Sequence, residues 1–257
     1  MASKLTNIFI AMLFCPCMNV FSMSRDTSFF KYALEAALKD DATIGEQKLL
    51  GDYYKNGGGI ERAPKKAFEW YMKAAIRGDA ASQYEVAILC ENGDGVEKNP
   101  EQAFEWMLKA AQQRYALAQH KVGNFYAKGF GVERDLESAL EWYLKAVKEV
   151  DVWILASYQL DLGKFYEEEI GDPWKAFMWY LKAAKLGARI ATHEVIRCYE
   201  NGIGVEKSHE KAVEWSHENG YEHYGEIDKR LEALLEEQVA RLDEQLKIVK
   251  ASGLWPK

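Results

Sequence analysis

Five tryptophans recur at an almost constant spacing, and no other feature of the sequence restricts the fold as strongly. Consecutive members of the series are separated by 36, 36, 37 and 36 residues. The series consists of Trp70, Trp106, Trp142, Trp179 and Trp215. An Ala precedes each of them by three residues, and an Ala follows each of the first four by four residues. A period of this length indicates stacked copies of one supersecondary unit.

Each unit is predicted to consist of two helices, which we term helix A and helix B. In helix A of the first unit, the small residue Gly51 is followed three positions later by the large ring of Tyr54. A glycine loop follows, and Asn-Gly directly after a helix favours a left-handed C-cap. Helix B opens with an N-cap residue or with Pro, as at Asn99 and Pro100.

The body of helix B has the spacing of an amphipathic helix. Ala, Trp, Tyr and Ala fall at positions i, i+3, i+4 and i+7, which form one helical face. In the first unit these residues are Ala67, Trp70, Tyr71 and Ala74. A Lys stands three residues after each of the first four tryptophans, and we expect a solvated charge on a buried stem there. These lysines are Lys73, Lys109, Lys145 and Lys182.

The repeats occupy residues 46–221, and the two flanking segments are predicted to be caps. Residues 25–45 are amphipathic and are predicted to form an N-terminal capping helix. Residues 226–250 contain no Gly or Pro, which predicts a helix of about 37 Å at roughly 1.5 Å per residue. We therefore expect residues 222–257 to form a long C-terminal capping helix, which an open solenoid requires, and which could also pair two chains into a homodimer.

Residues 1–24 are predicted to be a secretory signal peptide. Lys4 precedes an apolar run, and Ser22 and Ser24 supply the small residues of a cleavage site. This places the protein in the periplasm or outside the cell, with no membrane span after cleavage. A lipidated Cys15 and an uncleaved start are the alternatives. Cys90 and Cys198, the two cysteines left after cleavage, are interpreted as small buried hydrophobes.

The composition excludes two broad classes of protein. With 48% hydrophobic residues the chain is too apolar to be disordered. Its 33 Lys and Arg against 40 Asp and Glu give a net charge of −7. A net-acidic chain lacks the basic surface that phosphate neutralisation needs, so a nucleic-acid partner is not expected.

These residues resemble the Sel-1-like repeat family, which is related to the tetratricopeptide repeats. The third unit follows the family pattern at Ala118, Val122, Gly123, Tyr126, Gly129, Gly131, Val132, Asp135, Ala139, Trp142, Tyr143, Lys145 and Ala146. Departures from the pattern are Ala87 and Ile196 at the Gly position, Cys90 at the Tyr position, a trimmed loop before Asp172, and Ser216 after Trp215.

The resemblance implies an all-α, right-handed superhelical solenoid of about five two-helix repeats, with helix A lining its concave face. It also implies a non-catalytic adaptor, since members of the family mostly bind proteins. Some members are similar to periplasmic immunity proteins that block a toxin, and a disulfide-rich branch is tied to β-lactam hydrolysis.

Patterns that could carry catalysis or metal binding are weak. Ser208 and Lys211 have the S-x-x-K spacing of serine β-lactamases, but Ser208 also stands where an N-cap is expected. His209, His217 and His223 lie close in sequence without a Cys or carboxylate at zinc-site spacing. We therefore predict no catalytic residue, no metal and no cofactor.

Binding is predicted at helix A positions that vary between units. In the tetratricopeptide relatives, the residues three before, one after and four after the small residue face the groove. Tyr84 and Ile88 are apolar where the other units are polar, as in an interface hot spot, although both could instead pack on an adjacent helix A, and the charges could be solvated surface. The predicted binding residues are Lys48, Asp52, Lys55, Tyr84, Ile88, Glu91, His120, Asn124, Lys164, Glu167, His193 and Arg197.

The sequence thus favours an exported, non-enzymatic protein that binds a protein or peptide in its concave groove. An adaptor and a toxin-neutralising immunity protein are equally compatible with this interpretation. The alternatives are a β-lactam or cell-wall hydrolase and a structural protein that self-assembles through its C-terminal helix.

Overall fold

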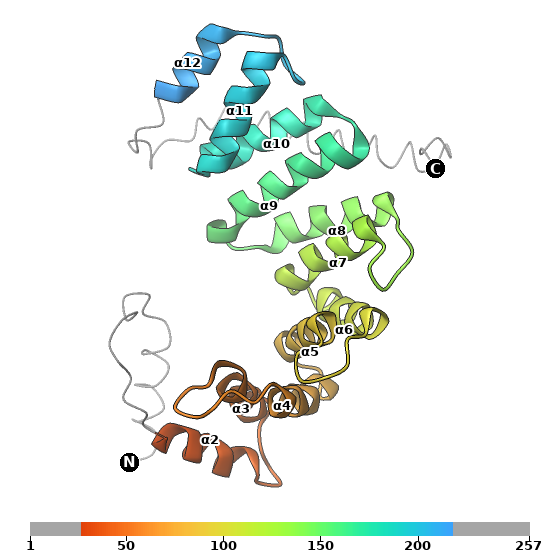
Figure 1. The fold of residues 1–257 in the computed structure, drawn as a ribbon, viewed down its shortest axis with the longest axis vertical. Coiled ribbons are helices and arrows are strands. Elements are labelled where there is room, and N and C mark those ends of the chain that lie inside the picture. Colours follow the sequence, from red (N-terminus) through yellow and green to blue (C-terminus); the bar gives the residue numbers. More distant parts are fainter. Residues whose placement is uncertain (1–26, 218–257) are drawn as a thin grey trace. The chain divides into compact units, whose positions relative to one another are not determined.

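The computed structural model describes residues 27–217, and every regular element in that range is helical (Figure 1). The two-helix units expected from the sequence are called repeats below. The described residues fall into two larger compact parts, called the first and second unit, which divide between Glu149 and Val150. The first unit holds α2 (Ser28–Ala37), α3 (Ile44–Asn56), α4 (Pro64–Ile76), α5 (Ala80–Asn92), α6 (Pro100–Gln112), α7 (Ala116–Lys128) and α8 (Leu136–Glu149). The second holds α9 (Val152–Phe165), η1 (Tyr166–Ile170), α10 (Pro173–Lys185), α11 (Arg189–Asn201) and α12 (His209–His217).

The prediction of an all-α chain of two-helix repeats is confirmed. Helix A of the five repeats is α3, α5, α7, α9 and α11, and helix B is α4, α6, α8, α10 and α12. Within each unit, helices that follow one another in sequence pack together. The signal peptide predicted for residues 1–24 and the whole of the cap predicted for residues 222–257 lie outside the described residues. Between Thr27 and His217, no helix is long and apolar enough to cross a membrane.

The helix ends form as the loop and cap residues predict. Gly57, Gly93, Gly129 and Gly202 each follow a helix A in the left-handed region, with φ between 67° and 76°. At the start of α6, Asn99 Oδ1 accepts the backbone N–H of Gln102 at 2.8 Å. Such caps satisfy backbone groups that have no partner within the helix.

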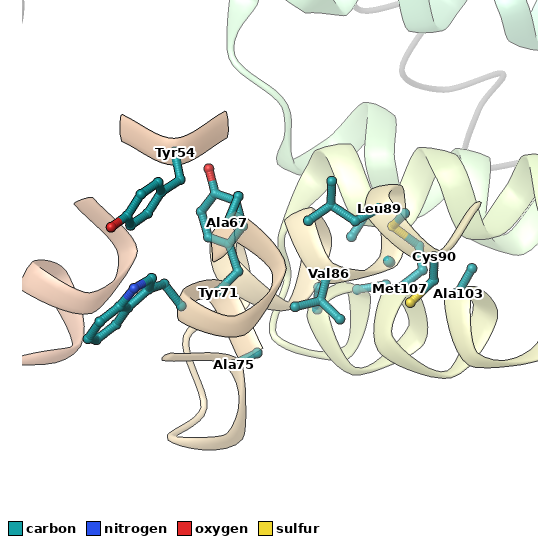
Figure 2. Close-up of a cluster of buried hydrophobic side chains, with 14 of the residues drawn as sticks. Tyr54, Ala67, Tyr71, Ala75, Val86, Leu89, Cys90, Ala103 and Met107 are labelled. Atoms are coloured by element: carbon teal, nitrogen blue, oxygen red, sulfur yellow. The ribbon is translucent and has the colours of Figure 1, made fainter. Parts of the chain in front are cut away.

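Helix A and helix B are held together by a glycine against an aromatic ring. A Cβ at Gly51 would come within 2.7 Å of the ring of Tyr71, and one at Gly123 within 2.8 Å of the ring of Tyr143. Tyr71 is fully buried, and Figure 2 shows its ring in the core together with Tyr54 and Ala67. The Gly position is small because a neighbouring ring occupies the space of its side chain.

The second repeat keeps this packing with a different pair of residues. Ala87 replaces the Gly, and Met107 stands where the other repeats have Tyr71 or Tyr143. Ala87 and Met107 are both fully buried in the core of the first unit, and Figure 2 shows Met107 among the core side chains. The departure at Ala87 is therefore matched by a slimmer, flexible side chain on helix B, as packing at constant volume requires.

In the second, third and fifth repeats, the second glycine of the loop touches the preceding repeat. A Cβ at Gly131 would collide with the carbonyl group of Pro100, and one at Gly204 with the carbonyl group of Pro173. These prolines are the first residues of α6 and α10. The loop of one repeat therefore rests directly on the first residue of helix B in the repeat before it. This contact links the second loop glycine to the proline that begins helix B.

Additional features mark the N-terminal segment and the fourth repeat. Within the cap expected at residues 25–45, α2 packs on α3, with the Phe30 ring edge-on to Tyr54 at 5.4 Å. In the fourth repeat, helix A ends in the π-helix η1, and its shortened loop keeps a single left-handed Gly171. Cys90 and Cys198 are free thiols and fully buried, which confirms their interpretation as small core residues.

Candidate interaction surface

The predicted binding residues lie on the helix A elements and none of them is buried. Eleven of the twelve are partly exposed, and His193 is exposed. In each unit they lie on the accessible side of the helix A elements, which is here called the A face of that unit.

Two of these residues hold the core tyrosines instead of standing free. Tyr71 Oη donates a hydrogen bond to Asp52 Oδ1 at 2.6 Å, and Tyr143 Oη donates to Asn124 Oδ1 at 2.9 Å. Burial, reinforced by the Asp52 carboxylate, raises the pKa of Tyr71 far above its usual value. The position after the small residue is thus an acceptor because a buried phenol needs a partner.

The same relationship explains why Ile88 is apolar. Ile88 occupies the position of Asp52 and Asn124, but the second repeat has Met107 in place of the tyrosine. A thioether has no proton to donate, so an acceptor at position 88 would gain no bond from helix B. The apolar character of Ile88 therefore has a structural cause, and it also leaves an apolar side chain on the A face.

The charges on the A face of the first unit are largely paired with one another. Lys55 Nζ lies 2.5 Å from Glu85 on α5, and Glu91 accepts from Lys121 on α7 at 3.0 Å. Within α3, Lys48 contacts Asp52 at 3.0 Å. Partly exposed pairs of this kind contribute roughly 0.2–1 kcal/mol each. Their main consequence is that neighbouring A helices are cross-linked and little unbalanced charge remains for a partner.

Tyr84 and Tyr115 lie close to these charges, since Glu85 acts on both hydroxyl groups, and together with Ile88 they are here called the aromatic strip. The rings of Tyr84 and Tyr115 meet edge to face with centroids 5.5 Å apart. All three side chains pack on the core and all three are partly exposed. The hot-spot and packing interpretations of Tyr84 and Ile88 are therefore compatible. One side of each side chain packs on the core, and the other side is accessible to solvent.

The hydroxyl groups of the aromatic strip remain protonated at physiological pH. Burial raises the pKa of Tyr84 to about 12, and the Glu85, Tyr115 and Glu91 side chains add to the effect. Burial also raises the pKa of Tyr115. The strip therefore presents two neutral phenols, which can donate hydrogen bonds as well as offer apolar surface.

His120 and Asn124 extend the A face on α7. The imidazole of His120 lies against the Tyr143 ring with centroids 5.4 Å apart. Asn124 Nδ2 lies 3.3 Å from His120 Nδ1 and donates to the His120 carbonyl oxygen at 3.3 Å. Both side chains are thus in contact with the core tyrosine, His120 through its ring and Asn124 through its hydrogen bond.

In the second unit, Glu167 is the centre of a charged network. Tyr180 Oη donates to Glu167 at 2.8 Å, and Arg197 donates to both of its carboxylate oxygens at 2.6 and 2.8 Å. Burial opposes ionisation of Glu167, but the bonds from Arg197 and Tyr180 outweigh it and hold its pKa below the usual value. Glu194 also accepts from Arg197 at 2.6 Å.

The network shows how the fourth repeat deviates from the others. The acceptor for the core tyrosine is Glu167, four residues after the small residue, whereas the first and third repeats use the residue directly after it. Lys164 stands at that adjacent position and cannot accept a hydrogen bond. Glu167 and Arg197, both predicted as binding residues, are therefore engaged with each other.

Sequence reasoning did not single out several residues that shape this surface. Tyr115, Glu85 and Lys121 belong to the strip and its ion pairs, and their positions vary too much between repeats to be recognised. A row of glutamines four residues before the small residue was detectable, because one residue type recurs in one phase. Its described members are Gln47, Gln83, Gln119 and Gln159.

The glutamine row links each helix A to the end of the preceding helix B. Gln83 Nε2 donates to the Ala75 carbonyl oxygen at 3.1 Å, and Gln119 Nε2 donates to the Ala111 carbonyl oxygen at 3.3 Å. These carbonyls lie in the last turn of α4 and α6, where they also accept the backbone N–H groups of Gly78 and Arg114, each at 3.0 Å. The glutamines therefore serve the packing between repeats.

The S-x-x-K pattern is a helix start. Ser208 Oγ accepts the backbone N–H of Lys211 at 3.3 Å, as an N-cap does. Lys211 Nζ lies 5.6 Å from the centre of the Tyr199 ring, as Lys66 and Lys175 lie over Tyr54 and Tyr166. Within residues 27–217 no group of three or more His, Cys, Asp or Glu is placed to hold a metal ion.

Comparisons with known proteins agree with the repeat architecture. The family model described as Sel1 repeat matches residues 47–79, 80–115, 116–150, 156–187 and 189–218. No curated protein matched the sequence. A Sel1 repeat protein from Oxalobacter formigenes is 30% identical, with a TM-score of 0.63 over 75% of this chain and 78% of that one.

Two further solved structures are similar. A protective antigen from uropathogenic Escherichia coli strains, which displays an SLR fold, is 28% identical, with a TM-score of 0.66 over 76% of this chain and 42% of that one. An immunity protein from Pseudomonas aeruginosa is 19% identical, with a TM-score of 0.42 over 90% of this chain and 86% of that one.

Proposed function

Since the chain belongs to the Sel1 repeat family, we propose that it is a non-enzymatic binding protein that holds a protein or peptide partner on the A face of its first unit. The observation that carries this proposal is the aromatic strip of Tyr84, Ile88 and Tyr115. Its side chains are fixed by the core, partly exposed and bordered by ion pairs that already neutralise one another.

The composition of the strip indicates what kind of contact the partner makes. Large aromatic side chains that are held rigid lose little conformational entropy on binding and contribute most to hot spots. Because the surrounding charges are paired, we expect the partner to insert an apolar or aromatic side chain and to accept hydrogen bonds from the two phenols. A mainly electrostatic partner would need unpaired charge on this face.

Export determines the compartment in which the protein meets its partner. The sequence features of residues 1–24 support export, so we propose that binding occurs in the periplasm or outside the cell. An adaptor and an immunity protein that neutralises a toxin would both hold their partner on this surface. They differ in whether the captured partner loses an activity when it is bound.

The test is affinity capture from the native host with full-length protein. Tyr84→Ala should weaken capture of the specific partner by about 30-fold, which corresponds to roughly 2 kcal/mol for a hot-spot side chain. Ile88→Asp should have a similar effect. Tyr32→Ala removes an exposed tyrosine from α2 and serves as the matched control.

The captured protein is then purified and titrated against each variant, with helical circular dichroism as the check on folding. Undiminished binding by folded Tyr84→Ala and Ile88→Asp proteins would refute the assignment of the strip. If the partner is an enzyme or a toxin, its activity is measured with and without this chain. Inhibition indicates an immunity protein, and retained activity indicates an adaptor.

A further inference from the structure

The turn between α6 and α7 contains a residue in an unusual backbone conformation. Arg114 has a φ of 63°, and no other non-glycine residue between Thr27 and His217 has a positive φ. Two other turns that lead from helix B to helix A have a glycine at this place, Gly78 with φ 97° and Gly187 with φ 82°. A non-glycine residue is strained there, because its Cβ comes too close to the following carbonyl oxygen.

The backbone of this turn does not require an arginine. The Arg114 N–H donates to the Ala111 carbonyl oxygen at 3.0 Å. In the turn between α4 and α5, the Gly78 N–H donates to the Ala75 carbonyl oxygen at the same distance of 3.0 Å. A glycine at position 114 would therefore form the same turn without strain, so any reason for the arginine lies in its side chain.

The side chain of Arg114 forms a fork with Glu149, the last residue of α8. Nε donates to one carboxylate oxygen at 3.1 Å, and Nη2 donates to both oxygens at 2.8 Å. The Arg114 side chain is 75% exposed, so solvent screens the attraction between the two charges. A screened pair contributes less to stability than the left-handed backbone of a non-glycine residue costs. The fork by itself does not account for Arg114.

The fork leaves one end of the guanidinium available and balances its charge. Nη1 of Arg114 has no hydrogen-bond partner among the described residues. The five N–H donors of an arginine lie in one rigid plane, so a fork on one edge also fixes the direction of the others. Nη1 is therefore a pre-oriented donor. It suits an uncharged acceptor, because a carboxylate of the partner would also meet the negative charge of Glu149.

Arg114 is the direct neighbour of the aromatic strip. Tyr115 follows it in the same turn, and the Tyr115 ring packs on Tyr84. The hydroxyl groups of these two tyrosines likewise have no hydrogen-bond partner within residues 27–217. The buried core tyrosines, in contrast, each donate to an acceptor on helix A or η1. Arg114 and the strip thus supply three donors that lack an acceptor.

We propose that Arg114 contacts the partner on the A face of the first unit, and that its Nη1 donates to a main-chain carbonyl oxygen beside the residue held by the strip. The inference rests on the proposed function and specifies the form of the partner. Carbonyl oxygens in the middle of a helix are already bonded within that helix. The partner therefore presents an extended segment or a loop, whose carbonyl groups are available.

Thermal unfolding of the full-length chain tests whether Arg114 has a structural role. Arg114→Gly removes the fork together with the backbone strain, so the melting temperature should stay equal or rise by a few degrees. Arg189→Gly removes an exposed arginine of α11 and is the matched control. A clearly lower melting temperature for Arg114→Gly would show that the fork stabilises the fold, and it would overturn the proposal.

Titration with the partner protein that the wild-type chain captures tests the contact itself. Arg114→Gly should weaken binding about tenfold, as expected for the loss of one hydrogen bond, and Arg189→Gly should not weaken it. Tyr84→Ala is measured in parallel. Weaker binding by Tyr84→Ala with unchanged binding by Arg114→Gly would refute this inference alone, whereas unchanged binding by both variants would refute the proposed function as well.

The salt dependence of binding tests the nature of the acceptor. With an uncharged carbonyl oxygen, the difference between the wild-type and Arg114→Gly proteins should be the same at about 50 mM and about 500 mM NaCl, because salt screens only interactions between charges. A difference that disappears at the higher concentration would identify a charged acceptor and would overturn the assignment of a main-chain carbonyl.

Discussion

Gly163 of α9 lies directly against the ring of Tyr180 of α10, so that a Cβ at position 163 would come within 2.5 Å of two ring carbons. Tyr180 is 1% exposed and its hydroxyl reaches Glu167. The same arrangement joins Gly51 to Tyr71 and Gly123 to Tyr143. A ring seated on a glycine is thus the common unit of packing in three of the five repeats.

The glycine–tyrosine contact predicts a large effect from a single methyl group. Gly123→Ala should lower the free energy of unfolding by about 1–3 kcal/mol, because overpacking against the buried Tyr143 ring outweighs the gain in helix propensity. Gly45→Ala is the control, since its Cβ would meet nothing closer than 3.9 Å and should be neutral or stabilising. Urea denaturation followed by circular dichroism measures both.

A compensating variant tests the packing rule directly. Gly123→Ala combined with Asn124→Ile and Tyr143→Met reproduces the residues of the second repeat at Ala87, Ile88 and Met107. The triple variant should recover at least half of the stability lost in Gly123→Ala. A triple variant as unstable as the sum of its single changes would contradict the exchange of residues inferred here.

Substitution of a loop glycine by Ala should destabilise the protein to a degree that depends on the atoms next to that glycine. Gly131→Ala adds a clash with the Pro100 carbonyl to the strain of a left-handed backbone, whereas Gly171→Ala adds only the backbone strain, since nothing lies within 4 Å. The strain alone costs about 1–2 kcal/mol. We expect Gly131→Ala to be clearly more destabilising in thermal unfolding. Equal losses would exclude a role for contact between repeats.

The end of the last repeat is predicted to be covered by further chain. Val213 is 38% exposed, whereas Leu140 and Phe177, at the same phase in earlier repeats, are buried. We propose that residues 222–257 supply the missing cover. Val213→Asp should then lower the melting temperature of the full-length protein by several degrees and have little further effect after deletion of 222–257. Equal effects in both backgrounds would refute the assignment.

Lys182 should make stability depend on pH in a defined direction. Its pKa is lowered to about 8 in the folded protein, while that of an unfolded lysine is about 10.4. Between these values the unfolded chain binds more protons, so stability should rise with pH. Lys182→Met should remove this rise. Denaturation midpoints of the two proteins from pH 7 to pH 10 provide the measurement, and parallel profiles would argue against a lowered pKa.

Glu167 should make the stability of the fold depend on pH in the acidic range. Its pKa is held below the usual value by Arg197 and Tyr180, so the stability it contributes is present at neutral pH and is lost as the pH falls through the folded pKa. Glu167→Gln should cost about 1 kcal/mol at pH 7. The difference from wild type should shrink as the pH falls below 4, and a constant difference would show that the charge is irrelevant.

The sequence alone determined the architecture because repetition multiplies weak local signals. One Trp or one Asn-Gly pair predicts little, but residues that recur at a constant phase through five repeats predict the two helices, the caps and the loops of each repeat. The caps at Asn99 and Ser208 and the left-handed Gly57 and Gly93 form as predicted. These features depend on neighbours within a few residues, which a sequence displays directly.

Only the tertiary structure decided which A-face side chains are available to contact a binding partner. Asp52 and Asn124 were predicted to meet a partner, yet they accept hydrogen bonds from tyrosines 19 residues away. Lys55 is paired with Glu85, 30 residues away, on the next helix A. Such pairings depend on how successive helices are placed against one another, and that placement is set by packing over the whole repeat. Sequence periodicity specifies the phase of a side chain, whereas its partner is specified by the contact between helices.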